Sequence, residues 1–177
     1  MSITKQQLLD IIKKNILINF TPKLLESLKT SKGKTQDPER NYIDKIKTIF
    51  DENNITYECA SSQQSKDFRN INNIGLDLEI KKTDGFSILF NDTCPNENIE
   101  YCILVTGNKK YKPQILFING HDIIKTSPYI LEYIRDITII KNKYCRGENK
   151  KNLDLGMMRA YVRPNLSADI SSLLETN

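Results

Sequence analysis

Near Ile55 the spacing of apolar residues changes, and this change limits what the chain can fold into. Before Ile55, apolar residues recur three and four positions apart, the spacing of amphipathic helices. After it, short β-branched or aromatic runs are separated by Gly, Asn, Asp and Pro, a pattern typical of strands. We therefore expect an α/β domain with helices against a mixed, mostly antiparallel sheet.

Three helices are expected before this change. The first has a capping-box pattern, because Gln7 follows Thr4 by three residues and an apolar stripe comes next. A second, short helix follows Pro22. Pro38 opens the third, whose apolar stripe ends near Asn53.

Strands are expected at 55–60, 76–83, 86–90, 101–106 and 115–118. Asp84-Gly85 lies between two of these runs and predicts a β-hairpin. Ser127-Pro128 has the pattern of a helix start. The buried side of that helix is expected to carry Ile130, Leu131, Ile134 and Ile137. A strand at 158–162 and a terminal helix at 167–174 complete the prediction.

Length and net charge limit the number of domains and the kinds of partner, but they do not indicate a specific function. The chain has 177 residues, which suits a single domain. We divide it into an N-terminal helical segment (1–36), a central core (37–140) and a basic loop, strand and helix (141–177). The net charge of +4 permits a polyanionic partner without requiring one.

Several kinds of chemistry and location are excluded or disfavoured. The four cysteines are far apart and form no CxxC motif, so reduced thiols are expected instead of a zinc site or a disulfide framework. The single histidine, His121, excludes multi-histidine metal sites and lies in a turn context that favours a surface or capping role. Without a run of 18 apolar residues or an apolar signal segment, a cytoplasmic protein with no membrane partner is expected.

The strand at 76–83 carries the most informative side chains. Because side chains alternate along a strand, Asp77, Glu79 and Lys81 share one face. Mg²⁺ requires oxygen ligands and usually takes one or two carboxylates plus water and phosphate. Glu79, joined by an aspartate from a neighbouring strand or turn, meets this requirement. Lys81 would then contact a phosphate or orient a water.

The Glu-x-Lys pattern alone is weak. A second copy begins at Glu148 in a polar loop, where we interpret it as solvated surface. For the copy at Glu79, the alternative is an amphipathic strand whose charged outer face provides solubility.

Asp67, followed after 11 residues by Glu79-Ile80-Lys81 on a strand hairpin behind an acidic helix, resembles the PD-(D/E)xK nuclease superfamily. The likeness is greatest to small type II restriction endonucleases, although Lys66 stands where the motif has proline. It covers residues 38–106 and implies a restriction-endonuclease-like core. It also implies metal-dependent hydrolysis of double-stranded DNA, usually by a homodimer. Asp67 and Glu79 would bind Mg²⁺, with Mn²⁺ as a substitute, and Lys81 would position the water.

Such nucleases often add an acidic residue from the helix before the first strand. Glu39, Asp44 and Glu52 are the candidates. Helical spacing places Glu39 on the apolar face and Asp44 on the other side, so Glu39 is selected as a catalytic candidate. The alternative for Glu39 is a first-turn glutamate favoured by the helix dipole.

Asp77 competes with Asp67 as the partner of Glu79. Residues two apart on a strand are separated by about 6.5 Å along the backbone, which is wide for one small ion. Asp67 from another strand is therefore preferred.

Basic residues concentrate toward the C-terminus and suggest a phosphate-binding surface. In the strand at 158–162, alternation puts Tyr161 and its flanking arginines on one face, suited to guanine edges or phosphates, or to a solvated outer face. The polar loop before Asp67 is a second candidate. The expected DNA-binding residues are Gln63, Gln64, Lys82, Arg146, Arg159, Tyr161 and Arg163.

The leading expectation is a sequence-specific endodeoxyribonuclease of the type II restriction class. Two alternatives stay open. One is a structure-selective repair, recombination or RNA-processing nuclease with the same core. The other is a non-catalytic nucleic-acid-binding module in which Glu79 and Lys81 are surface charges.

Overall fold

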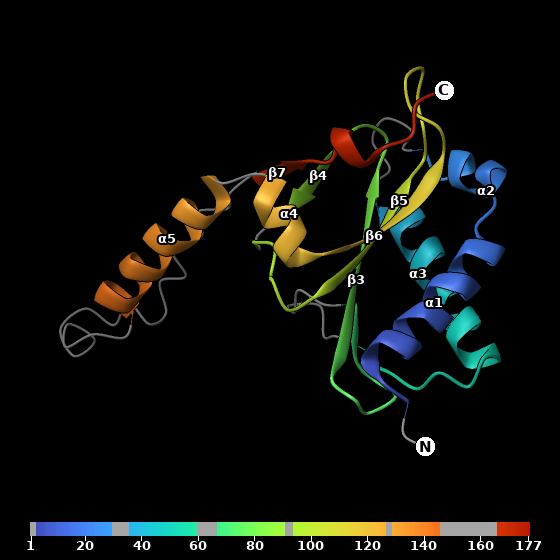
Figure 1. Cartoon of the computed structure of the whole chain (residues 1–177), viewed down its shortest axis with the longest axis horizontal. Helices are drawn as coiled ribbons and strands as arrows, with labels where there is room; N and C mark the ends of the chain where they lie inside the picture. Colours follow the sequence, from blue (N-terminus) through green and yellow to red (C-terminus); the bar gives the residue numbers. More distant parts are fainter. Residues whose placement is uncertain (1–2, 30–35, 60–66, 91–93, 127–128, 146–165) are drawn as a thin grey trace.

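The computed structural model describes residues 3–29, 36–59, 67–90, 94–126, 129–145 and 166–177. Within them it leaves the side chains of 36–40, 126, 140–145 and 166 undescribed. The chain forms an α/β fold in which helices flank a mixed five-stranded sheet (Figure 1). Within the described ranges, no helix is both long enough and apolar enough to cross a bilayer.

The main sheet has the strand order β1-β2-β3-β5-β6. β3 and β5 are parallel, and the other neighbouring strands are antiparallel. A second sheet pairs β4 with β7. The strands are β1 (Glu58–Cys59), β2 (Phe68–Ile71), β3 (Leu76–Thr83), β4 (Ser87–Phe90), β5 (Glu100–Val105), β6 (Gln114–Asn119) and β7 (Leu166–Asp169).

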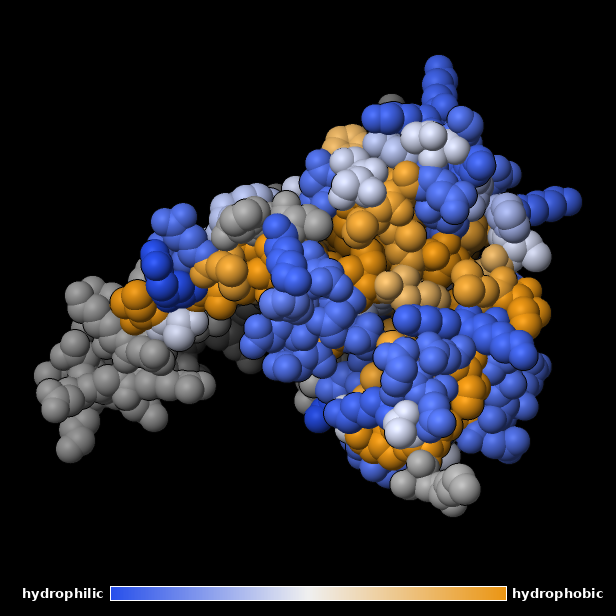
Figure 2. All heavy atoms as spheres, viewed as in Figure 1, coloured by the Kyte–Doolittle hydropathy of each residue, from blue (hydrophilic) through white to orange (hydrophobic). Residues whose placement is uncertain are grey.

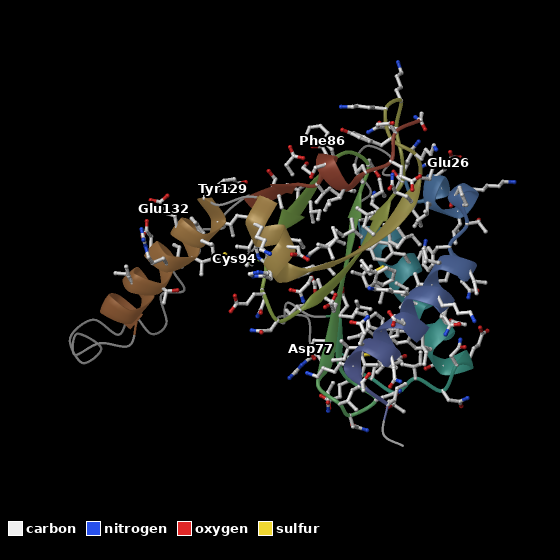
Figure 3. The ribbon with its side chains drawn as sticks, viewed as in Figure 1. Glu26, Asp77, Phe86, Cys94, Tyr129 and Glu132 are labelled. Atoms are coloured by element: carbon white, nitrogen blue, oxygen red, sulfur yellow. The ribbon has the colours of Figure 1, made fainter. Side chains whose placement is uncertain are left out.

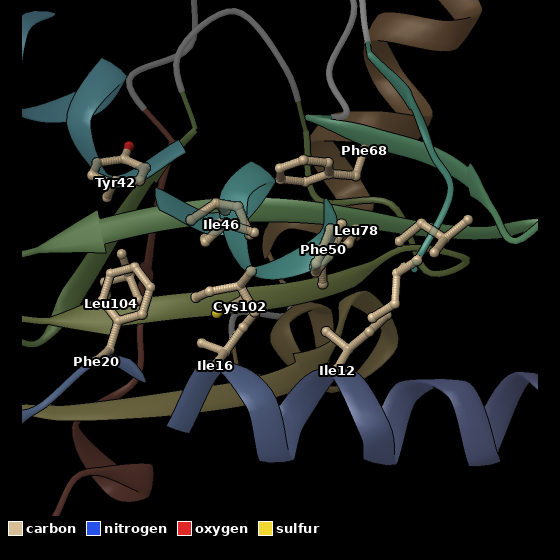
Figure 4. Packing of buried hydrophobic residues seen from close by; sticks show 14 of the residues in the cluster. Ile12, Ile16, Phe20, Tyr42, Ile46, Phe50, Phe68, Leu78, Cys102 and Leu104 are labelled. Carbon is tan, nitrogen blue, oxygen red and sulfur yellow. The ribbon is translucent and has the colours of Figure 1, made fainter. Parts of the chain in front are cut away.

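The first three helices cover one face of the main sheet. They are α1 (Lys5–Asn19), α2 (Pro22–Ser27) and α3 (Gln36–Glu52). The predicted capping box at the start of α1 is confirmed, since Thr4 and Gln7 exchange hydrogen bonds. Figure 4 shows side chains of α1 and α3 meeting Phe68, Leu78 and Cys102 of the sheet in one buried cluster.

The opposite face carries the second sheet and α4 (Gly120–Thr126). Its core joins alternate residues of β5, including Tyr101 and Ile103, to Ile88 and Phe90 of β4. α5 (Tyr129–Cys145) packs Ile130 into this core and then extends away from the sheet (Figure 1). The main sheet therefore has a helical face and a second face where β4 lies against β3 and β5.

The predicted hairpin at Asp84-Gly85 is wrong. β3 does not pair with β4, which pairs with β7 instead. A two-residue hairpin of the expected type needs positive φ at its central residues. Positive φ occurs at Asn72, Asn73 and Gly75, in the turn that joins β2 to β3.

The predicted terminal helix at 167–174 is also wrong. This segment begins in β7 and continues as a 3₁₀ turn at Ser171–Leu173. Buried Ala168 and Ile170 alternate with more exposed Ser167 and Asp169, so the strand period prevails over the helical one.

The predicted α5 face is partly wrong, because Leu131 is exposed while Ile130 is buried. Helical geometry explains this, since adjacent residues lie about 100° apart around the axis. α4 was predicted only as a turn, and α3 begins at Gln36, two residues before Pro38. The predicted strand at 158–162 and helix start at Ser127-Pro128 lie outside the described residues.

Candidate active site on the β2–β3 hairpin

The β2–β3 hairpin brings Asp67 and Glu79 together. Phe68 pairs with Leu78 in the antiparallel register, so the residues just outside this pair, Asp67 and Glu79, are opposite one another. Asp67 Oδ2 accepts a hydrogen bond of 2.7 Å from the backbone N–H of Ile80. This bond fixes the Asp67 carboxylate against the strand that carries Glu79.

Asp77 has a different position in the hairpin. The register shifts between Phe68 and Ile71, and Asn70 there has a φ of 45°. Asp77 Oδ1 accepts a 2.9 Å hydrogen bond from the Asn70 N–H at this irregularity. Figure 3 shows Asp77 near the start of β3. Its carboxylate thus contributes to the shape of the hairpin.

Glu79 is a buried carboxylate on the face opposite the helical layer. In the parallel pairing of β3 with β5 it lies beside Tyr101, which belongs to the second core. The residue is only 7% exposed. Its Oε1 atom is 2.7 Å from Lys81 Nζ, whereas its buried Oε2 has no hydrogen-bond partner within the part of the chain that the structure describes.

Burial dominates the electrostatics of Glu79. Desolvation raises the pKa of its carboxyl from 4.5 to about 7, although the ammonium of Lys81 lowers it. The negative charge of Asp67 raises the pKa further. The two carboxylates therefore repel each other, and a second positive charge beside Glu79 would favour its ionised form.

Aromatic side chains border Lys81. Its Nζ lies 5.7 Å from the ring centroid of Phe90, and the Phe90 and Tyr101 rings meet edge to face at 5.8 Å. Tyr101 accepts a 2.9 Å hydrogen bond from the N–H of Asn96 through its hydroxyl oxygen. Burial raises the pKa of Tyr101 to about 12, so the hydroxyl stays neutral at physiological pH.

Phe90, Tyr101 and Cys94 were not predicted as members of this site. Cys94 contributes to the raised pKa of Tyr101, and Figure 3 shows it on the α4 side of β3. Sequence gives no signal for this grouping, because it depends on the parallel alignment of β3 with β5 and on β4 crossing to a second layer.

Lys82 is separated from this group. It pairs in register with Leu104, whose side chain belongs to the helical face, and its Nζ is 2.8 Å from Asp84 Oδ1. The structure thus places Lys81 and Lys82 on opposite faces of β3.

The side chains of the remaining predicted site residues lie outside the described residues, so their positions relative to Glu79 stay predictions. The backbone of Glu39 lies in α3, whose buried residues pack on the helical face, but its side chain is outside the described residues. The other expected DNA contacts are likewise outside them: Gln63, Gln64, Arg146, Arg159, Tyr161 and Arg163.

Asp67 and Glu79 could bind a cation, but they supply only a few protein ligands. Among the described side chains, no cluster of three or more His, Cys, Asp or Glu could hold a metal ion. Mg²⁺ nevertheless binds many sites through one or two carboxylates, with water and phosphate completing its shell. Asp67 and Glu79 fit this limited requirement, and the unpartnered Glu79 Oε2 is a suitable oxygen ligand.

Comparison of the chain with models of protein families, with curated proteins and with solved structures found no match. The function of the protein is therefore inferred from the geometry around Glu79.

Proposed function

We propose that this protein is a divalent-metal-dependent endodeoxyribonuclease with a restriction-endonuclease-like core, which hydrolyses double-stranded DNA at a specific sequence. The observation that carries the proposal is the buried Oε2 of Glu79, which has no hydrogen-bond partner among the described residues and lies beside Asp67 and Lys81. A buried carboxylate oxygen without a partner is costly unless another group satisfies it. A metal ion is a group of suitable charge and ligand preference.

Asp67 and Glu79 would each supply an oxygen to Mg²⁺. Asp67 is suited to this role because the Ile80 N–H bonds one of its oxygens and holds the carboxylate in place. The bound ion would supply Lewis-acid activation of a phosphate oxygen and a water of lowered pKa.

Lys81 lies at the Oε1 atom of Glu79, whereas the metal ion would bind at Oε2, and from this position Lys81 would act on the substrate. Its ammonium is held between Glu79 Oε1 and the Phe90 ring, so it is positioned before substrate arrives. From there it can orient the attacking water and stabilise charge developing on the phosphate. Hydrolysis adds water across the P–O3′ bond, which releases the 3′ hydroxyl and leaves a 5′ phosphate.

The test combines metal binding with cleavage. Purified wild-type protein should bind Mg²⁺ or Mn²⁺ in calorimetry, and Asp67→Asn and Glu79→Gln should lose this heat. With Mg²⁺, wild type should cut DNA of known sequence into discrete fragments. Lys81→Ala should lower the rate by at least about a hundredfold while DNA binding persists.

Two substitutions serve as matched controls. Asp77→Asn changes a carboxylate on the same strand but keeps an oxygen acceptor for the Asn70 N–H, and it should cut at nearly the wild-type rate. Lys125→Ala removes an exposed ammonium on α4 and should also leave cleavage unchanged. Wild-type rates in Glu79→Gln or Lys81→Ala would refute the proposed site. Cleavage restricted to junctions, flaps or RNA would replace sequence specificity with structure selectivity.

A further inference from the structure

The outer edge of β6 presents backbone groups that no other described strand pairs with. β6 ends the main sheet and pairs only with β5 among the described strands. The Gly120 N–H donates to the Ile99 carbonyl, which fixes the alternation of hydrogen bonds along this antiparallel pair. Residues 114, 116 and 118 therefore direct their backbone groups toward β5, and residues 115, 117 and 119 direct theirs outward.

The β6 strand itself carries little protection against pairing with another chain, although the Nζ of Lys13 on α1 lies 5.6 Å from the Phe117 ring centroid. No backbone partner for the outward groups of Ile115 and Phe117 occurs within the described coordinates. The strand Gln-Ile-Leu-Phe-Ile-Asn contains no charge and no proline, the residue types that commonly block exposed edges. An open, apolar edge of this kind can accept one further strand.

The C-terminal tail limits where that strand can begin. The side-chain amide of Gln114 donates to the Glu175 carbonyl at 3.1 Å and accepts from the Glu175 N–H at 3.1 Å. The Lys112 N–H also donates to Glu175. The open part of the edge therefore runs from Ile115 to Asn119, and Phe117 is its centre.

A groove with a mixed apolar and polar lining borders this open edge. It has a volume of about 390 Å³ and is lined by residues of α1, α2, β6 and the C-terminal segment. Leu17, on α1, lines it and is 53% exposed. Apolar side chains gather over β6 in the surface view (Figure 2). Burial of this surface would add hydrophobic stabilisation to backbone pairing.

We propose that the occupant is a second copy of this chain, paired antiparallel through β6 about a twofold axis at Phe117. Phe117 then lies opposite the partner's Phe117, and Leu116 lies opposite the partner's Ile118. The outward backbone groups of Ile115 and Phe117 and the outward N–H of Asn119 gain partners, and two five-stranded sheets become one.

The strand itself favours a second copy over an unrelated peptide. The twofold register places Leu116 opposite the partner's Ile118 on one face of the sheet and pairs the two Phe117 side chains on the other face, while Ile115 lies opposite the partner's Asn119. This inference does not depend on the proposed nuclease activity.

Sedimentation and light scattering on the full chain give the first test, and wild type should be a dimer. Ile115→Pro removes an outward N–H without removing a bond to β5, so it should give a folded monomer by circular dichroism. Leu116→Pro is the matched control, because it removes a ladder bond to β5 and should destabilise the fold. A monomeric wild type, or an Ile115→Pro dimer, would overturn the proposal.

Cysteine cross-linking tests the register and does not rely on Ile115→Pro folding. In a chain carrying Cys59→Ser, Phe117→Cys should form a disulfide to the partner's residue 117, because hydrogen-bonded antiparallel pairs have Cα atoms about 5.5 Å apart. Leu116→Cys is the control, since its two copies would be about 8 Å apart. Peptide mapping by mass spectrometry identifies the link. Linking through position 116 as readily as through 117 would contradict the register.

Discussion

Replacing Glu79 with glutamine should change how the stability of the metal-free protein depends on pH. The Glu79 carboxyl has a pKa of about 7 in the fold, against 4.5 for the ordinary group. Glutamine keeps the shape of the side chain but does not titrate. The difference in unfolding free energy between variant and wild type therefore reports the titration of Glu79 together with its coupling to Asp67 and Lys81.

The sign follows from proton linkage. Between pH 4.5 and about 7, the folded state holds a proton on Glu79 that the unfolded state has released. Wild-type stability falls as pH rises through this window, because a raised carboxyl pKa favours folding only at low pH. At about 1.4 kcal/mol per pKa unit, the loss amounts to about 3 kcal/mol once the pH exceeds 7.

The assay is urea denaturation of both proteins in EDTA at several pH values from 4.5 to 8. The stability of Glu79→Gln relative to wild type should rise by about 3 kcal/mol over this range. The attraction of the Lys81 ammonium is already included in the Glu79 pKa of about 7. Asp77→Asn, treated in the same way, should not reproduce the rise, because its carboxylate meets the Asn70 N–H instead of Glu79.

Metal addition extends the measurement. At pH 8, Mg²⁺ at a hundred times its dissociation constant should stabilise wild type by about 2.7 kcal/mol and leave Glu79→Gln unchanged. A relative stability that stays constant from pH 4.5 to 8 would refute the pKa argument. Equal stabilisation of both proteins by Mg²⁺ would refute Glu79 as a ligand.

Two further predictions concern the packing of the fold. Gly107→Ala should destabilise the protein by about 1 to 3 kcal/mol in the same denaturation assay. Gly107 has a φ of 77°, and an added Cβ would lie 2.7 Å from the Pro113 nitrogen. Gly75→Ala should cost less stability, because Gly75 has a similar φ but its neighbour is the flexible side chain of Lys5. Thiol labelling of the native protein should modify exposed Cys59 and spare Cys102, whose pKa is raised by complete burial; equal rates for both would contradict this packing.

Local patterns were enough to predict the first helix and β3, but no strand was predicted at the position of β2. The capping box at Thr4 and Gln7 indicated the first helix, and the alternation at 76–83 indicated β3 with its observed bounds. These signals are local, since they depend on helical or strand periodicity within one segment. The placement of Asp67 opposite Glu79 also agrees with the expectation of a carboxylate from a neighbouring strand.

Long-range pairing could not be predicted in the same way. Asp84-Gly85 has a hairpin sequence, but the Thr83 hydroxyl donates to the Ser87 carbonyl and Asp84 accepts from the Thr106 hydroxyl. These contacts hold the connection as it crosses from the main sheet to the second one. The pairing of β4 with β7 joins segments nearly eighty residues apart, and no local pattern specifies it.

The burial of Glu79 bears on two interpretations of the charged face of β3. A pair that serves only solubility remains solvated, as Asp44 and Lys47 do on α3, where the side chains are 68% and 37% exposed. Glu79 instead lies beside Tyr101 in the second core.

In a buried ion pair with a purely structural role, the attraction between the charges offsets the free-energy cost of desolvation only when every polar atom is hydrogen-bonded. Here Lys81 satisfies Oε1 while Glu79 Oε2 has no hydrogen-bond partner among the described residues, and Asp67 adds a like charge. An apolar side chain at position 79 would avoid these costs, since β3 there lies between two apolar layers. Departures from local stability rules of this kind concentrate where a protein binds or reacts. The energetic cost at Glu79 is therefore the strongest reason to test this hairpin first for metal binding.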